Sequence, residues 1–293
     1  MLQNKSKHDK YYWIFTLPGF LIFTLVVMIP FIIGIRYSFF SWNGISKTKI
    51  FVGFTNYLNL FTNDEGAINS LTFTFKYTFT VVILSNLIGL ILALLIVKIP
   101  NFKGLFRVIF FLPNVIGGLI LGFIWRFLLI NALPVIGNFL HINAISYPWL
   151  GDLTSSYWGT VIVYVWKTTG YLMVIYIASL LTIDKNILEA ANIDGATNST
   201  VFLKIKLPLI MPAITICIFL MLSWAFKLFD VIFSLTNGGP FGSTEAFALN
   251  IYNEAFKFNN YGYASAKSVL FFILVALISV FQVRFTKKRE VSL

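Results

Sequence analysis

Charged residues and cysteine are both scarce in this chain. Only 11% of its 293 residues are Asp, Glu, Lys or Arg, against about 25% in an average soluble domain. The one cysteine, Cys217, lies in an apolar run, which excludes a disulfide framework and a thiolate metal cluster. His8 and His141 are far apart, and no HExxH, CxxC or GxxxxGK[ST] motif occurs. An ordinary soluble enzyme, a metal site of recognisable spacing and a chain that hydrolyses ATP by itself are therefore excluded.

Long apolar runs fill most of the sequence. Hydrophobic residues make up 58% of the chain, more than a soluble fold of this length can bury. A helix needs about 20 apolar residues to cross the hydrocarbon core of a bilayer. Six stretches meet this length, at roughly 12–36, 72–97, 107–130, 157–181, 209–235 and 264–285. The sequence therefore predicts an all-α polytopic membrane protein with six transmembrane helices.

The basic residues give this arrangement an orientation. Six spans place both termini on one side, and that side holds thirteen of the 22 Lys and Arg residues, within 5–10, 98–107, 185–206 and 284–289. The opposite side holds only Arg36, Lys47, Lys49 and Lys257. The positive-inside rule then predicts that both termini are cytoplasmic in a multi-pass cell-membrane protein. The net charge of +11 is accordingly an orientation signal, and no nucleic-acid partner is expected.

These spans predict the organisation of the whole chain. A cytoplasmic N-terminus (1–11) precedes the first span (12–36) and an extracytoplasmic loop (37–71). A five-helix core (72–285) follows and contains a polar cytoplasmic segment at 182–208, and a cytoplasmic C-terminus (286–293) ends the chain.

Segment 182–208 is longer than a connection between two spans requires, and it has helical signals of its own. Its apolar residues between 187 and 193 are spaced for a short amphipathic helix, with Asp184 or Asn186 available as the N-cap. Gly195 can adopt the positive φ that ends such a helix.

A second short helix is expected over about 197–206, and Pro208 suits the first turn of the next span. The periodicity leaves two interpretations of this helix–turn–helix equally open. It is either a docking element for a cytoplasmic partner or an amphipathic hairpin that lies on the lipid surface.

The residues of this segment resemble a family signature. The order Glu-Ala-Ala, three residues, Gly, nine residues, Ile, one residue, Leu-Pro resembles the EAA–G–I–LP motif of bacterial ABC importer permeases. The residues that carry it are Glu189, Ala190, Ala191, Gly195, Ile205, Leu207 and Pro208, and Asp194, Ala196 and Pro212 extend the match. Residues 51–57 (FVGFTNY) and 235–240 (LTNGGP) are similar to outer segments of the carbohydrate-importer branch, in the maltose-permease-like half.

The resemblance implies a type I ABC importer permease architecture and a carbohydrate substrate, with an oligosaccharide favoured over the alternative, glycerol phosphate. It further implies a second permease subunit, two ATPase subunits that hold ATP and Mg²⁺, and an extracytoplasmic solute-binding protein that delivers the sugar. This chain would then contain no cofactor of its own and would not be an enzyme. Within segment 182–208, Glu189 would anchor the ATPase, Ala190 and Ala191 would pack against it, Gly195 would form the turn and Pro208 would transmit motion to the fifth span.

Polar residues inside the spans are candidates for the translocation pathway, because unpaired charges there are costly. Lys227 and Asp230 stand three residues apart in the fifth expected span, so a continuous helix would allow them to pair. Asn86, Trp224 and Lys167 are further candidates. The alternative interpretation is an internal salt bridge, or a lysine that reaches towards the interface.

Two other functions compete with the importer. An ion-coupled secondary transporter would show inverted repeats or paired broken helices in the two halves, and no convincing repeat is present. A membrane-embedded enzyme would need a cluster of His, Asp, Glu or Cys, and none recurs within a span. A passive scaffold would leave segment 182–208 without a role.

Overall fold

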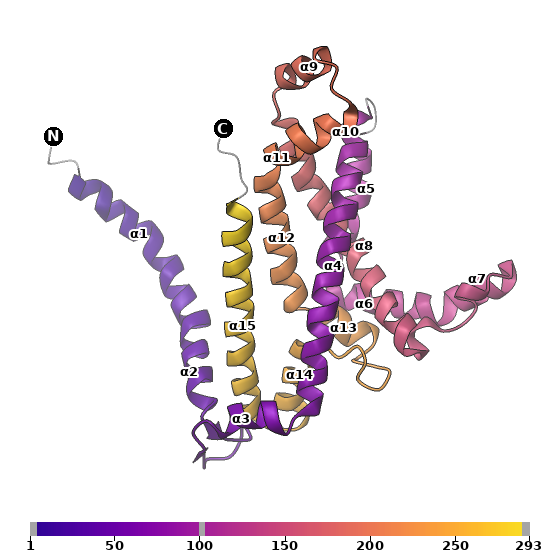
Figure 1. The fold of residues 1–293 in the computed structure, drawn as a ribbon. Coiled ribbons are helices and arrows are strands. Elements are labelled where there is room, and N and C mark those ends of the chain that lie inside the picture. Colours follow the sequence, from indigo (N-terminus) through magenta and orange to yellow (C-terminus); the bar gives the residue numbers. More distant parts are fainter. Residues whose placement is uncertain (1–4, 100–102, 289–293) are drawn as a thin grey trace. The chain divides into compact units, whose positions relative to one another are not determined.

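The computed structural model describes residues 5–99 and 103–288 and is almost entirely helical (Figure 1). The termini expected in the cytoplasm lie in part outside these residues, at 1–4 and 289–293. The chain forms two compact units. One comprises the described residues up to Asp64 together with Ile251–Phe272, and the other comprises Glu65–Asn250 and the residues from Ile273 onward.

The first unit begins with one long apolar helix. Helix α1 (Lys5–Phe23) continues through a π-helical turn into α2 (Ile29–Tyr37). Its membrane-length portion, Trp13–Tyr37, buries no residue in this chain, and its apolar side chains are exposed all round. A helix that is apolar on every side requires lipid or another protein around it.

Short elements follow this helix. Strands β1 (Phe40–Ser41) and β2 (Ile50–Phe51) form an antiparallel pair, with Phe40 opposite Phe51. Helix α3 (Thr55–Thr62) comes next, and the buried Asn56 amide donates hydrogen bonds to the Ser38 and Phe40 carbonyls. The unit also contains the π-helical turn Asn253–Lys257 and the first part of α15 (Tyr261–Lys287).

The second unit contains most of the remaining helices. They are α4 (Glu65–Lys98), α5 (Lys103–Val115), α6 (Gly118–Phe127), α7 (Leu133–Leu140), α8 (Leu153–Leu181), α12 (Met211–Phe226) and α13 (Asp230–Leu235). Shorter helices are α9 (Lys185–Ile193), α10 (Asn198–Val201), α11 (Leu207–Leu209) and α14 (Phe247–Tyr252), and single 3₁₀ turns lie at Asn143–Ile145 and Trp149–Gly151.

Three π-helical turns of the chain stand in the same relation to a proline. They lie at Thr24–Met28, Leu128–Ala132 and Phe202–Lys206, and the proline is the second residue after each turn: Pro30, Pro134 and Pro208. Proline has no N–H, and its ring collides with the carbonyl four residues earlier in a regular α-helix. A π-helical turn moves that carbonyl away, which is one way membrane helices tolerate proline.

The core of the second unit is the contact between α4 and α8, which run in the same direction. Five hydrogen bonds made by side chains join them along their length: Tyr77 Oη to the Thr160 carbonyl (3.2 Å), Thr80 to Tyr157 (2.8 Å), Tyr157 Oη to the Lys76 carbonyl (3.4 Å), Ser85 to Thr168 (3.0 Å) and Tyr176 Oη to Asn86 Oδ1 (2.6 Å). Glycine provides close approach on the same face, since a Cβ on Gly89 would lie 3.2 Å from that of Leu172. Small residues and interhelical hydrogen bonds are what hold membrane helices together.

The number of spans agrees with the sequence, but two helices are not continuous as expected. Five helices are long and apolar enough to cross a membrane, or six when the pair Asn198–Leu209 and Met211–Phe226, bent by 67°, counts as one. The expected third span, 107–130, is broken at Gly117, which has an extended backbone (φ −57°, ψ 138°) between α5 and α6. The expected fifth span, 209–235, is broken after Phe226.

Helix α5 packs so closely on α8 that only a glycine fits at one position of the contact. A Cβ on Gly170 would overlap the Phe110 carbonyl group. We expect Gly170→Ala to destabilise the protein by about 1–3 kcal/mol, the usual range for overpacking, and to lower the Tm in detergent. Gly104→Ala in α5, where no atom lies within 4 Å of the added Cβ, is the matched control. Equal Tm values for the two variants would show that α5 does not lie against α8 in this way.

Candidate coupling segment and candidate pathway residues

Helix α9, the first half of segment 182–208, is capped at both ends by local groups. The Asp184 carboxylate accepts a hydrogen bond from the Asn186 N–H (2.9 Å) and is the N-cap. Gly195 has φ +74°, and its N–H donates to the Asn192 carbonyl while the Ala196 N–H donates to Ala191. This pair of bonds is a Schellman C-cap, which glycine forms without strain. The predicted N-cap and the predicted glycine stop are both confirmed.

The second half of the segment forms the expected second helix. The Thr197 hydroxyl accepts from the Thr200 N–H (3.3 Å), and α10, the π-helical turn with Ile205, and α11 with Leu207 and Pro208 follow without a break.

The prediction for Pro208 is wrong, however. Pro208 lies before the 67° bend, and Pro212 occupies the first turn of α12. The physical reason is that the preceding π-helical turn lets the shorter helix continue through Pro208.

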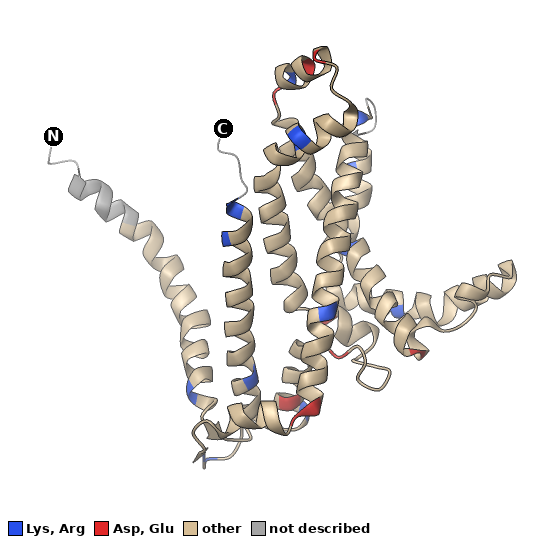
Figure 2. Cartoon of the chain, in the orientation of Figure 1, with Lys and Arg blue, Asp and Glu red and all other residues tan. Residues whose placement is uncertain are grey.

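Helix α9 is largely uncovered by the described residues of the chain. It has no buried residue: Glu189 and Ala190 are exposed, Ala191 is half-buried, and 86% of the surface of Ile193 is exposed. In Figure 1, α9 lies beyond the helical bundle at the end where α8 finishes and α12 begins. Figure 2 shows charged residues on α9, whereas α12 has none. The caps hold this helix in shape, and its apolar residues have no partner within the second unit.

The candidate pathway residues in the helices contact α8. The Asn86 amide oxygen accepts the Tyr176 hydroxyl (2.6 Å), and the Trp224 ring lies edge-on to Tyr171 with 5.1 Å between ring centroids. Asn86 therefore contributes to the packing of α4 on α8. Trp224 and Lys167 are both partly exposed.

The predicted pairing of Lys227 with Asp230 is wrong, and the break in the helix is the reason. Helix α12 ends at Phe226, Lys227 is its C-cap, and Asp230 begins α13. Asp230 instead packs on α6, where a Cβ on Gly118 would overlap its carboxylate. One Asp230 oxygen also accepts from the Val231 N–H (2.9 Å). Lys227 is exposed.

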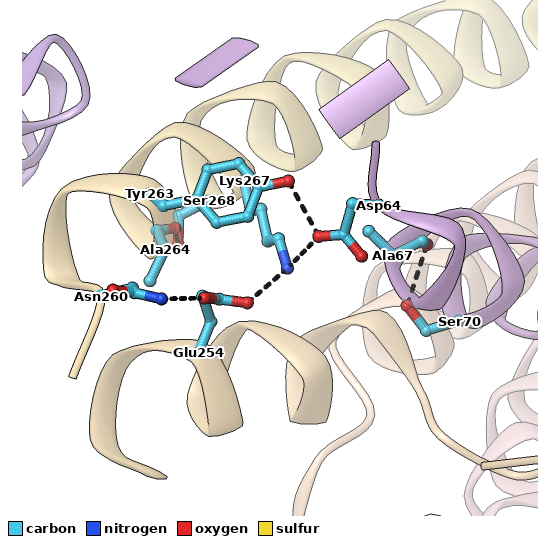
Figure 3. Close-up of polar contacts among 9 residues, drawn as sticks. All are labelled: Asp64, Ala67, Ser70, Glu254, Asn260, Tyr263, Ala264, Lys267 and Ser268. Atoms are coloured by element: carbon cyan, nitrogen blue, oxygen red, sulfur yellow. Dashed lines mark hydrogen bonds and ion pairs between the residues drawn. The ribbon is translucent and has the colours of Figure 1, made fainter. Parts of the chain in front are cut away.

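The first unit contains an ion cluster that the sequence does not predict. Lys267 of α15, 1% exposed, bridges Asp64 (2.8 Å) and Glu254 (2.9 Å), as Figure 3 shows. The Tyr263 hydroxyl donates to Asp64 (2.8 Å) and the Asn260 amide donates to Glu254 (2.8 Å). In the sequence Lys267 is only a lysine at the edge of a span, because its partners lie far away along the chain.

This geometry describes a membrane permease, and comparison with known proteins identifies the family. Residues 85–291 match the family model described as "Binding-protein-dependent transport system inner membrane component". The chain belongs to this family. The match includes segment 182–208, so the resemblance seen in the EAA–G–I–LP residues is confirmed at the level of the family. Membership favours a binding-protein-dependent transport system over the ion-coupled secondary transporter.

Relatives and solved structures extend over nearly the whole chain. It is 42% identical to a probable starch degradation products transport system permease protein, AmyD, of Thermoanaerobacterium thermosulfurigenes, covering 98% of this chain and 97% of that protein. It is 32% identical to the multiple sugar-binding transport system permease protein MsmF of Streptococcus mutans, over 97% and 98%.

A crystal structure of a bacterial alginate ABC transporter, in complex with an alginate pentasaccharide-bound periplasmic protein, contains a chain of the same fold. The TM-score is 0.82 at 21% identity, over 98% of this chain and 97% of that one. The predicted type I importer permease fold is thereby confirmed. The chain is a multi-pass membrane transport subunit.

The ion cluster of this permease allows a direct test of its first unit. Removal of the buried Lys267 ammonium leaves two carboxylates facing each other, and breaking a buried ion network typically costs about 3–5 kcal/mol. We therefore expect Lys267→Met to lower the Tm of the purified protein strongly. Replacing the whole network, with Asp64→Asn and Glu254→Gln added, should recover most of the loss.

The control for this prediction is Lys257→Met, an exposed lysine of the same unit. A Tm for Lys267→Met equal to that of the control would show that the ion cluster does not stabilise the fold.

Proposed function

We propose that this permease forms half of the translocation pathway of an ATP-driven importer for an oligosaccharide. The relatives in starch-product and multiple-sugar transport support a carbohydrate substrate. An extracytoplasmic solute-binding protein delivers the sugar, and a second permease subunit forms the other half of the pathway. Two separate ATPase subunits hold ATP and Mg²⁺, and this chain holds no cofactor. Both termini lie in the cytoplasm, as the distribution of Lys and Arg supports.

The observation that carries this proposal is the isolation of α9. A helix of nine residues is marginal in water by itself, and α9 has two complete caps in place of packing against its own unit. Its exposed Ala190 gives a flat surface that another backbone can approach, and Glu189 next to it gives a charged anchor. The exposed Ile187 and Ile193 on the same helix need a cover, and the small Ala190 beside the charged Glu189 supports a protein cleft as that cover.

The mechanism follows from this placement. ATP-driven closure of the ATPase subunits moves the docked α9, and the continuous α10–α11 segment carries the movement to the bend before α12. The spans then alternate between an outward-open and an inward-open state. Nucleotide supplies the free energy by binding one of the two states more tightly.

The exposure of helix Trp13–Tyr37 is an argument for the presence of a second permease subunit. Among the described residues, none of its membrane-length portion is buried, although Phe31 contacts Phe272. A related but distinct permease is the expected partner, so that the two together form a heterodimer.

Uptake assays test the coupling role of α9. We expect Glu189→Lys or Gly195→Asp to abolish sugar uptake and ATPase co-purification while the protein still inserts into the membrane. Glu189→Lys reverses the anchoring charge, and Gly195→Asp places a side chain at φ +74°, where only glycine is unstrained. Ser199→Lys, an equally exposed position in α10, is the control for added charge. Normal uptake and co-purification in both variants would eliminate the docking role.

The pathway residues Asn86, Trp224, Lys227 and Asp230 remain candidates for substrate contact, and Trp224 is the one best placed for a sugar. Its partly exposed ring offers an aromatic face beside Tyr171. We expect Trp224→Ala to raise the KM for uptake by up to about tenfold, the size of a lost aromatic contact. Trp125→Ala, which removes another edge-on aromatic pair, is the control. Unchanged KM and rate would remove Trp224 from the pathway, and a parallel assay of Asp230→Asn applies the same criterion to Asp230.

A further inference from the structure

Two cavities of the second unit meet at one tryptophan. An apolar groove of about 540 Å³ lies between α4, α5 and α8, and a polar pocket of about 400 Å³ lies next to the first turns of α8. Trp158 lines both of them. The apolar groove and the polar pocket therefore lie next to each other, on either side of Trp158.

The groove is suited to a hydrocarbon chain. Apart from Thr169 and the Trp158 and Trp166 rings, its lining is aliphatic, phenylalanine, proline or glycine. Along α8 it extends from Trp158 to Gly170, which at 1.5 Å per residue is about 18 Å. One leaflet of the hydrocarbon core is about 15 Å thick, half of the bilayer core. A sugar would leave its hydroxyl groups without partners here.

The polar pocket contains a cation and several hydroxyl groups. Lys76 Nζ lies 4.7 Å from the centre of the Tyr157 ring, and in the described part of the chain Lys76 forms no salt bridge. Thr72, Thr80 and Thr154 also line the pocket. Ser243 lines it too, and its buried Oγ has no hydrogen-bond partner. An ammonium without a carboxylate partner, in a pocket lined by threonine side chains, is suited to a phosphate oxygen.

The polar pocket lies at the depth of a lipid headgroup. Thr80 bonds to the Tyr157 hydroxyl (2.8 Å), which places Lys76 beside the first two turns of α8. Tyr157 and Trp158 are adjacent there, and these residue types concentrate at membrane–water interfaces. Lys76 itself is exposed and stands within a long apolar helix, where a lysine needs an anionic partner or water.

We propose that the groove and the pocket together bind one anionic phospholipid of the extracytoplasmic leaflet. The phosphate lies at Lys76 among the threonines of the polar pocket, and one acyl chain passes Trp158 and follows the groove. The assignment to that leaflet rests on the proposed orientation, but the site itself does not. An apolar helix of a second subunit would fill the groove and leave the Lys76 ammonium without an anionic partner, so an anionic lipid is the occupant that suits both cavities.

Native mass spectrometry of the full chain in a mild detergent tests the site. The probes are dioleoyl phosphatidylglycerol, dioleoylglycerol, which has the chains without the phosphate, and inorganic phosphate. We expect Lys76→Met to weaken phosphatidylglycerol binding about tenfold, the value of one charge-assisted hydrogen bond, with dioleoylglycerol binding unchanged. Ile162→Trp, which fills the groove, should weaken both lipids. Lys257→Met removes another exposed lysine and should change neither.

Three results would overturn the proposal. The first is equal phosphatidylglycerol binding by Lys76→Met and Lys257→Met. The second is inorganic phosphate binding as tightly as the lipid, which would leave the groove without a role. The third is loss of the lipid when the chain assembles with its partner subunits, which would show that protein covers the groove. None of these measurements depends on sugar uptake, so the importer function stands or fails separately.

Discussion

The fold depends on one constraint: a polar group within the hydrocarbon core must find its partner inside the protein. The contact between α4 and α8 shows how the chain meets it. Tyr77, Thr80, Ser85 and Asn86 each bond to α8, so these four polar side chains of α4 join the two helices instead of facing lipid. Pro30, Pro134 and Pro208 are tolerated because a π-helical turn before each proline moves the carbonyl that would otherwise collide with its ring.

The same constraint explains where the helices break. The chain stops being helical at Gly117 and again after Phe226, and the two interruptions lie on elements that pack together, α6 and α13. Asp230 packs against the bare backbone of Gly118, and Ser234 packs against Gly122 in the next turn. Irregular backbone at membrane depth is tolerated only inside protein or beside a cavity, so this pair of breaks marks an interior face of the permease.

Some of this architecture could be predicted from the sequence. Features set by interactions between neighbouring residues were predictable, and features set by interactions between residues distant in sequence were not. Asp184 and Gly195 set the two ends of α9 through bonds to residues within five positions, so periodicity and capping rules predict them well. The contact of Asp230 with Gly118 and the ion pair of Lys267 with Asp64 join residues more than a hundred positions apart, so no local pattern reveals either. Pro208 shows a second limit of prediction from the sequence. Proline alone does not say whether a helix begins there or continues through a π-helical turn.

The most direct test of the account is a cross-link from α9. Cys217 is the only cysteine and is buried, so Ala190→Cys adds a single accessible thiol to the chain. With the transporter assembled in membranes, a thiol-reactive cross-linker at position 190 should capture the ATPase subunit, and at Ile45→Cys, an exposed position in the other unit, it should not. The account predicts that nucleotide changes the yield at position 190. A thiol at position 190 that never reaches the ATPase, in any nucleotide state, would contradict it.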